Sequence, residues 1–172
     1  MRKVEVVPYN EKWPELFQEE ANKIKSVFGD EAINIYHIGS TAIPHIHAKP
    51  IIDILVEVKD VDKVDSFNDE MEQLGYKPKG ENGIAYRRYF TKGGNNRTHH
   101  VHVFKTGSEH ITRHLAFRDY LITHKDEANT YSELKQKLSK QFTYNAEKYT
   151  QGKDWFIKEI QANALKWWKN QT

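Results

Sequence analysis

The sequence has no cysteine among its 172 residues. This absence excludes a thiolate nucleophile, a disulfide framework, an iron–sulfur cluster and a cysteine-based zinc site. Acid–base or metal chemistry must therefore come from Asp, Glu, Lys, Tyr and the nine histidines. The chain also lacks a large charge of one sign, because 26 basic residues face 24 acidic residues and leave a formal charge of +2. That balance does not indicate a protein that binds nucleic acid by electrostatic attraction.

Long apolar runs are missing as well. The longest one, residues 51–58, is interrupted by Asp53 and Glu57, and the segment MRKVEVVPYNEKW has no apolar core of the signal-peptide kind. We therefore expect neither a signal peptide nor a membrane span, and we expect a cytoplasmic location. Aromatic residues make up 12% of the chain, which argues against disorder despite a charged fraction of 29%. This length is typical of one domain with a real hydrophobic core.

Hydrophobic periodicity indicates a mixed front part and a helical rear part. Apolar runs predict strands at residues 4–7, 33–38, 51–58, 84–91 and 98–104. A period of three to four residues predicts helices at 13–28 and 61–74, the second with Asp60 as its N-cap. Three more helices are expected after Ile111, with Gly152 as a break. We expect an α/β core over residues 1–110 and C-terminal helices over 111–172, packed as one compact unit.

Alternation along two of these strands predicts a polar cluster. In 51–58 the even-numbered positions are apolar, which leaves Asp53 on the opposite face. In 98–104 two valines point towards the core and set His100 and His102 on the other side. If both apolar faces cover the same helices, the three polar side chains share one surface and converge within about 8 Å.

A glycine–serine pair at a strand end is the second informative feature. Gly39 and Ser40 can turn the chain sharply and direct backbone N–H groups and a hydroxyl towards a phosphate. A carboxylate on the next strand, Asp53, can hold the metal that bridges that phosphate. The cations that could neutralise phosphate charge are Lys49, Arg87 and Arg88. Because the two arginines are adjacent on a strand, one of them at most faces the site.

The blocks PYNEKWPELF, YHIGSTAIPHIHAKPIIDILVEV, THHVHVF and LAFRDYL follow one another as in the GrpB-like family, which the chain resembles over nearly its whole length. This family is an uncharacterised group regarded as part of the nucleotidyltransferase superfamily. The resemblance implies an α+β fold, with a nucleotidyltransferase-like mixed sheet packed by helices on one face and a C-terminal helical part. It also implies a triphosphate-handling site around Gly39, Ser40, Thr41 and Asp53. Fusions of such domains to dephospho-CoA kinases in some bacteria suggest a link to coenzyme A metabolism.

One position departs from the superfamily pattern. Active nucleotidyltransferases carry a second carboxylate two residues after the first, where both can share magnesium ions, and here that position is Leu55. Glu57 lies on the same face but about 13 Å from Asp53 along an ideal strand, too far to replace the missing ligand. His100 and His102 fall where a third carboxylate is expected, and imidazole favours zinc or manganese over magnesium.

These residues are compatible with three functions. The first is transfer of a nucleotidyl group from a nucleoside triphosphate to a small-molecule acceptor, with a divalent metal such as Mg²⁺ on Asp53 and with His100 or His102 as base or metal ligand. The second, favoured by Leu55, is non-catalytic binding of a nucleotide or coenzyme A by a regulatory domain. The third is a hydrolase whose Zn²⁺ or Mn²⁺ is held by Asp53, His100 and His102.

Overall fold

The computed structural model describes residues 3–171, and these form two units. The sheet unit comprises residues 11–38 and 51–111, and the helical unit comprises residues 3–10, 39–50 and 112–171. The loop 39–50, which lies inside the predicted 1–110 core, thus groups with the C-terminal helices. In the part of the chain that the structure describes, no helix is both long enough and apolar enough to cross a membrane.

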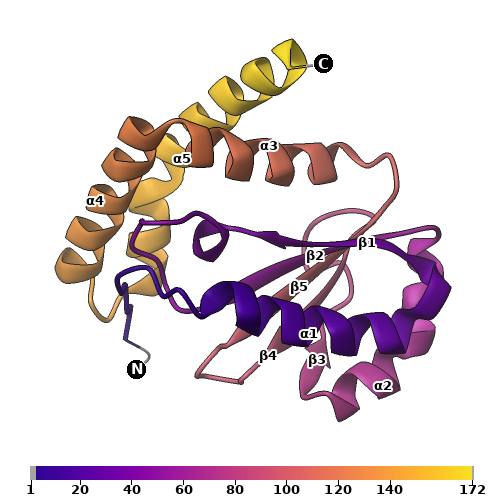
Figure 1. Ribbon diagram of the computed structural model, residues 1–172. Helices are drawn as coiled ribbons and strands as arrows, with labels where there is room; N and C mark the ends of the chain where they lie inside the picture. Colours follow the sequence, from indigo (N-terminus) through magenta and orange to yellow (C-terminus); the bar gives the residue numbers. More distant parts are fainter. Residues whose placement is uncertain (1–2, 172) are drawn as a thin grey trace. The chain divides into compact units, whose positions relative to one another are not determined.

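The sheet unit contains one mixed sheet with the strand order β1-β2-β5-β4-β3. Its strands are β1 (Ala32–Ile38), β2 (Ile52–Val58), β3 (Tyr76–Pro78), β4 (Arg88–Lys92) and β5 (His99–Lys105). The β2–β5 pair is parallel and the other pairs are antiparallel. The helices α1 (Trp13–Phe28) and α2 (Asn68–Gln73) cover one face (Figure 1). The predicted α+β class, a mixed sheet with helices on one face, is confirmed.

The helix predicted over residues 61–74 has two parts. A 3₁₀ helix, η3 (Val61–Phe67), precedes α2. The N-cap prediction is confirmed, because the Asp60 carboxylate accepts a hydrogen bond of 3.0 Å from the backbone N–H of Asp62. Two shorter 3₁₀ segments are η1 (Gly29–Glu31) and η2 (Ser40–Ala42).

Two strand predictions are wrong in extent. The strand predicted at 84–91 begins only at Arg88, because residues 79–87 form turns in which Asn82 and Tyr86 have positive φ. The strand predicted at 4–7 is reduced to a single bridge between Val7 and Ala48. Short β3 was not predicted, since a three-residue strand that ends in proline leaves almost no periodic signal.

Strand register defines two different faces of the sheet. On one face, Val101 and Val103 of β5 pair with Ile54 and Val56 of β2, and all four are fully buried. This face packs on α1, since His37 of β1 stacks on Phe17 of α1. The other face carries the polar residues of β2 and β5, as alternation predicts.

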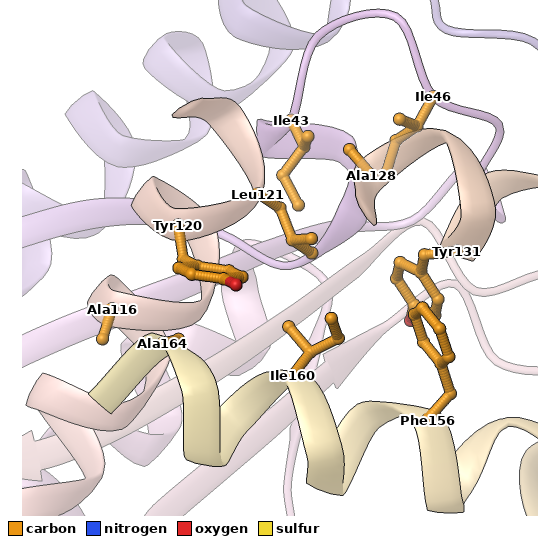
Figure 2. Close-up of a cluster of buried hydrophobic side chains, with 10 residues drawn as sticks. All are labelled: Ile43, Ile46, Ala116, Tyr120, Leu121, Ala128, Tyr131, Phe156, Ile160 and Ala164. Atoms are coloured by element: carbon orange, nitrogen blue, oxygen red, sulfur yellow. The ribbon is translucent and has the colours of Figure 1, made fainter. Parts of the chain in front are cut away.

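Three helices build the helical unit: α3 (Glu109–Thr123), α4 (Lys125–Gln141) and α5 (Ala146–Asn170). Their apolar stripes meet in a core in which Tyr131 of α4 stacks on Phe156 of α5, with ring centroids 5.7 Å apart (Figure 2). The loop 39–50 contributes Ile43 and Ile46 to the same core. The loop is therefore part of the folded helical unit.

The break predicted at Gly152 is wrong, because α5 runs through it without interruption. A Cβ atom at this position would lie 2.7 Å from a methyl group of Leu138 on α4. Glycine here permits a close approach of the two helices instead of ending one of them.

We expect Gly152→Ala to lower the free energy of unfolding by about 1 kcal/mol, because the added methyl group overpacks the contact with Leu138. The same change in an unconstrained helix interior raises it by about 1 kcal/mol. Urea denaturation measures the difference. In a Leu138→Ala background Gly152→Ala should become stabilising, and a stabilising effect in the unmodified chain would contradict this explanation.

Candidate functional site

The centre of the candidate site is one carboxylate oxygen that faces two imidazole rings. Oδ1 of Asp53 on β2 lies 3.3 Å from Nδ1 of His100 and 3.4 Å from Nε2 of His102. The parallel register pairs Asp53 with His100 and Leu55 with His102, so both rings reach the carboxylate from the neighbouring strand. The predicted convergence of these three side chains is confirmed.

The electrostatics of this group keep Asp53 charged. Burial acts to raise the pKa of Asp53, but hydrogen bonds from His100 and His102, together with their charges, outweigh it and hold the pKa well below its ordinary value. The carboxylate is therefore ionised throughout the neutral pH range. Since 28% of the Asp53 side chain and 24% of the His100 side chain remain exposed, a ligand can reach both.

In the neutral form of both rings, the contacts of His100 and His102 favour opposite tautomers. Nη1 of Arg87 lies 3.4 Å from Nδ1 of His102, and a guanidinium can only donate. Nδ1 of His102 is then the acceptor, and its Nε2 carries the hydrogen directed at Asp53. His100 meets Asp53 through Nδ1, so that its Nε2 keeps the lone pair and can act as a base.

Arg87 is held rigidly beside His102. Its side chain donates to the backbone carbonyls of Glu81 and Asn82 at 3.1 and 2.8 Å, and its guanidinium lies 4.5 Å from the Tyr89 ring centroid. The turns at 79–87 that replace the predicted strand thus supply the carbonyl groups that fix this cation. Only 6% of Arg87 is exposed, so a ligand can contact its guanidinium only from inside the site.

Arg88 does not join this group. It pairs in register with Val103, and its guanidinium lies 2.7 Å from Asp65 and 3.3 Å from Asp62 of η3. The prediction that one arginine at most faces the site is confirmed, and that arginine is Arg87. The phosphate-binding role expected of Arg88 is replaced by this ion-pair network on the helix-covered face.

A second acidic ligand is missing from the site. Leu55, at the expected position, is fully buried, and Glu57 accepts hydrogen bonds from Thr106 and Asn34 at 2.6 and 2.9 Å. Over residues 3–171, no group of three or more His, Asp or Glu side chains has the arrangement of a metal site. Magnesium prefers several oxygen ligands, and this group supplies one carboxylate beside two imidazoles, so the two-magnesium arrangement lacks its second carboxylate. The zinc or manganese site expected on Asp53, His100 and His102 stays a prediction.

The residues of the predicted glycine–serine motif belong to the helical unit. Gly39 has φ of 74°, which favours glycine, and Ser40, Thr41 and Ala42 form the turn η2, so the predicted sharp turn is confirmed. Thr41 is buried, and Nζ of Lys49 lies 4.7 Å from the centroid of the Tyr149 ring. The roles of Gly39, Ser40, Thr41 and Lys49 in phosphate binding stay predictions.

Comparison with known proteins identifies the family. The model of the family described as GrpB protein matches residues 3–163. The chain belongs to the GrpB family. Among its relatives, the UPF0157 protein YqkA of Bacillus subtilis is 54% identical over 170 residues, which are 99% of this chain and 50% of YqkA. The chain thus spans half the length of that relative.

Solved structures agree with the GrpB assignment. The crystal structure of conserved protein GrpB from Enterococcus faecalis has 44% sequence identity and a TM-score of 0.92, and the match covers 94% of this chain and 98% of that one. The Cid1 poly(U) polymerase bound to MgATP is much less similar, with 12% identity and a TM-score of 0.44 over 75% of this chain and 45% of that one, and this likeness carries no conclusion. A shorter match, to dephospho-CoA kinase of Mycobacterium tuberculosis, has 35% identity over 74 residues, 41% of this chain and 18% of the kinase.

Sequence reasoning missed a buried carboxylate in this GrpB chain. Oε1 of Glu20 on α1 lies 2.8 Å from the Tyr76 hydroxyl and 2.9 Å from Nζ of Lys92, and its Oε2 lies 3.9 Å from Nε2 of His99. The signal was present, because Glu20 falls on the apolar stripe of α1, between Phe17 and Ile24. This cluster ties α1 to the sheet on the face opposite Asp53.

Proposed function

We propose that this chain binds a nucleotide-type phosphate ester beside Asp53 and transfers its nucleotidyl group to an acceptor hydroxyl, with His100 as general base. The observation that carries the proposal is the contact of Oδ1 of Asp53 with a ring nitrogen of both His100 and His102. A carboxylate that fixes the tautomer of an accessible imidazole is the arrangement that general-base catalysis requires.

The proposed step moves one proton and exchanges one phosphorus–oxygen bond. Nε2 of His100 takes the proton of the acceptor hydroxyl while the hydroxyl oxygen attacks the α-phosphorus. The bond from the α-phosphorus to the pyrophosphate oxygen breaks, and pyrophosphate leaves. Asp53 stabilises the imidazolium that forms on His100, and the fixed positive charge of Arg87 favours the anionic substrate.

A second candidate is non-catalytic binding of a nucleotide or of coenzyme A. It is favoured by the buried Leu55 at the position of the second carboxylate, and the match to dephospho-CoA kinase supports coenzyme A as the ligand to test. The third function, a metal-dependent hydrolase, stays a prediction from the sequence.

Ligand-induced thermal shifts and label transfer distinguish the candidates. We expect a nucleoside triphosphate from the set ATP, GTP and CTP to raise the melting temperature of the chain even without magnesium. With α-³²P-labelled triphosphate, label should pass to water or to a low-molecular-mass cell extract. A shift with coenzyme A alone and no label transfer would favour the second candidate. If no nucleotide and no coenzyme A shifts the melting temperature, both candidates are wrong.

A further inference from the structure

The helical unit buries an amine and a phenol that have no hydrogen-bond partner. In the described chain, Nζ of Lys135 on α4 and the hydroxyl of Tyr149 on α5 are both inaccessible and both unpaired. Lys135 is 1% exposed, and Tyr149 is fully buried. Burying polar groups without partners is costly, so each such group requires an explanation, and a bound ion is one of them.

Two more lysines lie near Tyr149, and Lys135 itself lies over a second tyrosine ring. Nζ of Lys135 is 4.4 Å from the ring centroid of Tyr131, one helical turn before it on α4. Nζ of Lys49 and Nζ of Lys153 lie 4.7 and 4.9 Å from the ring centroid of Tyr149. Lys49 and Lys153 share the Tyr149 ring, and the charge of Lys153 acts on Lys135. We call these three residues, from the loop 39–50, α4 and α5, the lysine cluster.

The loop that carries Lys49 is fixed on the helical unit. The backbone N–H of His47 donates to Oγ of Ser132 on α4 at 2.8 Å. Ala48 forms a two-way backbone bridge with Val7, with N···O distances of 2.9 and 3.0 Å. Lys49 is thus held at the cluster by the residues directly before it.

We propose that the lysine cluster and the Tyr149 hydroxyl form a binding site for a phosphate or diphosphate group. A protonated lysine can only donate hydrogen bonds, and the charge of Lys153 opposes protonation of Lys135. A phosphate dianion offers several acceptor oxygens and opposite charge, so it can accept hydrogen bonds from Lys135 and the Tyr149 hydroxyl and offset the charge of Lys153. A carboxylate offers less charge and fewer oxygens. All residues of this site lie in the helical unit, so the inference does not rest on the Asp53 site.

Protonation of Lys135 on anion binding gives this site a measurable signature. Burial, and after it the charge of Lys153, hold the pKa of Lys135 well below its usual value. The groups that act on Lys135 are the Tyr131 ring and the charge of Lys153, and neither is an anion at neutral pH. A bound phosphate would raise the pKa again, so binding takes up a proton at any pH between the free and bound pKa values, and it weakens as the pH rises through that window.

Calorimetric titration of the whole chain with inorganic phosphate and with pyrophosphate tests the site. Acetate and chloride at equal ionic strength serve as controls. We expect pyrophosphate to bind with proton uptake, which titrations in buffers of different ionisation enthalpy reveal. Lys135→Met should weaken binding at least tenfold and abolish the proton uptake. Lys137→Met, an exposed lysine on the same helix, should leave both unchanged.

Stability measurements keep this test independent of misfolding. Without anion, Lys135→Met should be at least as stable as the unmodified chain, because an apolar side chain replaces an unpaired amine. Tyr149→Phe removes only the unpaired hydroxyl and should bind pyrophosphate several-fold more weakly at unchanged stability. Wild-type affinity in both variants, or no binding of either anion by the unmodified chain, would overturn the proposal and leave the Asp53 site untouched.

Discussion

Asp53→Asn should reduce label transfer from the α-phosphate by about 10³- to 10⁴-fold, because an amide can hold His100 in the wrong tautomer and cannot stabilise the imidazolium. Binding of the triphosphate should survive, and can become tighter, because the change removes a negative charge beside an anionic ligand. Initial transfer rates and the ligand-induced shift in melting temperature, measured on the same preparations, separate the two effects.

Glu57→Gln is the matched control for Asp53→Asn. It converts a carboxylate to an amide on the same strand and the same face, but it lies outside the imidazole contacts. We expect transfer by Glu57→Gln to stay within a few-fold of the unmodified chain. Asp53→Asn could instead lose triphosphate binding only in samples that contain magnesium. That result would show that Asp53 acts as a metal ligand and would contradict its role in fixing His100 as the general base.

Glu20→Gln should lower the free energy of unfolding by about 2–3 kcal/mol. This loss is somewhat smaller than the loss on breaking a fully buried ion pair, because Lys92 is partly exposed. The substitution preserves shape and an acceptor oxygen for the Tyr76 hydroxyl, but it removes the charge that offsets the Lys92 ammonium. Glu20 is 4% exposed, so water cannot replace the lost interaction. The neighbouring Glu19→Gln on the exposed side of α1 should cost less than about 0.5 kcal/mol.

The difference in unfolding free energy between wild type and Glu20→Gln should depend on pH with a definite sign. Burial acts to raise the pKa of Glu20, but hydrogen bonds from Lys92 and Tyr76 and the charge of His99 lower it below its ordinary value. The stabilisation by Glu20 is therefore complete above about pH 4.3 and decreases as the pH falls through the lowered pKa. Urea denaturation at pH 7 and pH 3 should show the gap between wild type and Glu20→Gln narrowing in acid. An equal gap at both values would contradict the ion-pair explanation.

The polar cluster could be predicted because strand alternation is a local property. The fully buried valines of β5 and the even-numbered apolar residues of β2 determine which way Asp53, His100 and His102 point. The position of Arg87 could not be predicted, since it depends on turns in residues 79–87 whose positive-φ residues include a tyrosine. That Arg87, and not Arg88, is the arginine at the site followed only from the register of β4 with β5.

The other residues that the sequence did not reveal depend on contacts between distant segments. The partners of Glu20 lie 56 and 72 residues further along the chain, and no periodic pattern links them. Lys135 resembles a surface lysine in the sequence, although its spacing of four from Tyr131 puts it on the apolar stripe of α4. Nine histidines suggested metal binding, and alternation alone does not distinguish two imidazoles that share a metal with Asp53 from two that donate hydrogen bonds to its carboxylate.

The central claim, that Asp53 fixes His100 as a base, is tested most directly by the tautomers of the two imidazoles. A long-range ¹H–¹⁵N NMR spectrum of uniformly ¹⁵N-labelled chain, at a pH where the rings are neutral, reports which ring nitrogen carries hydrogen. His100→Gln and His102→Gln assign the signals. We expect hydrogen on Nδ1 of His100 and on Nε2 of His102, with the His100 preference lost in Asp53→Asn. Hydrogen on Nε2 of both rings, unchanged by Asp53→Asn, would contradict the site.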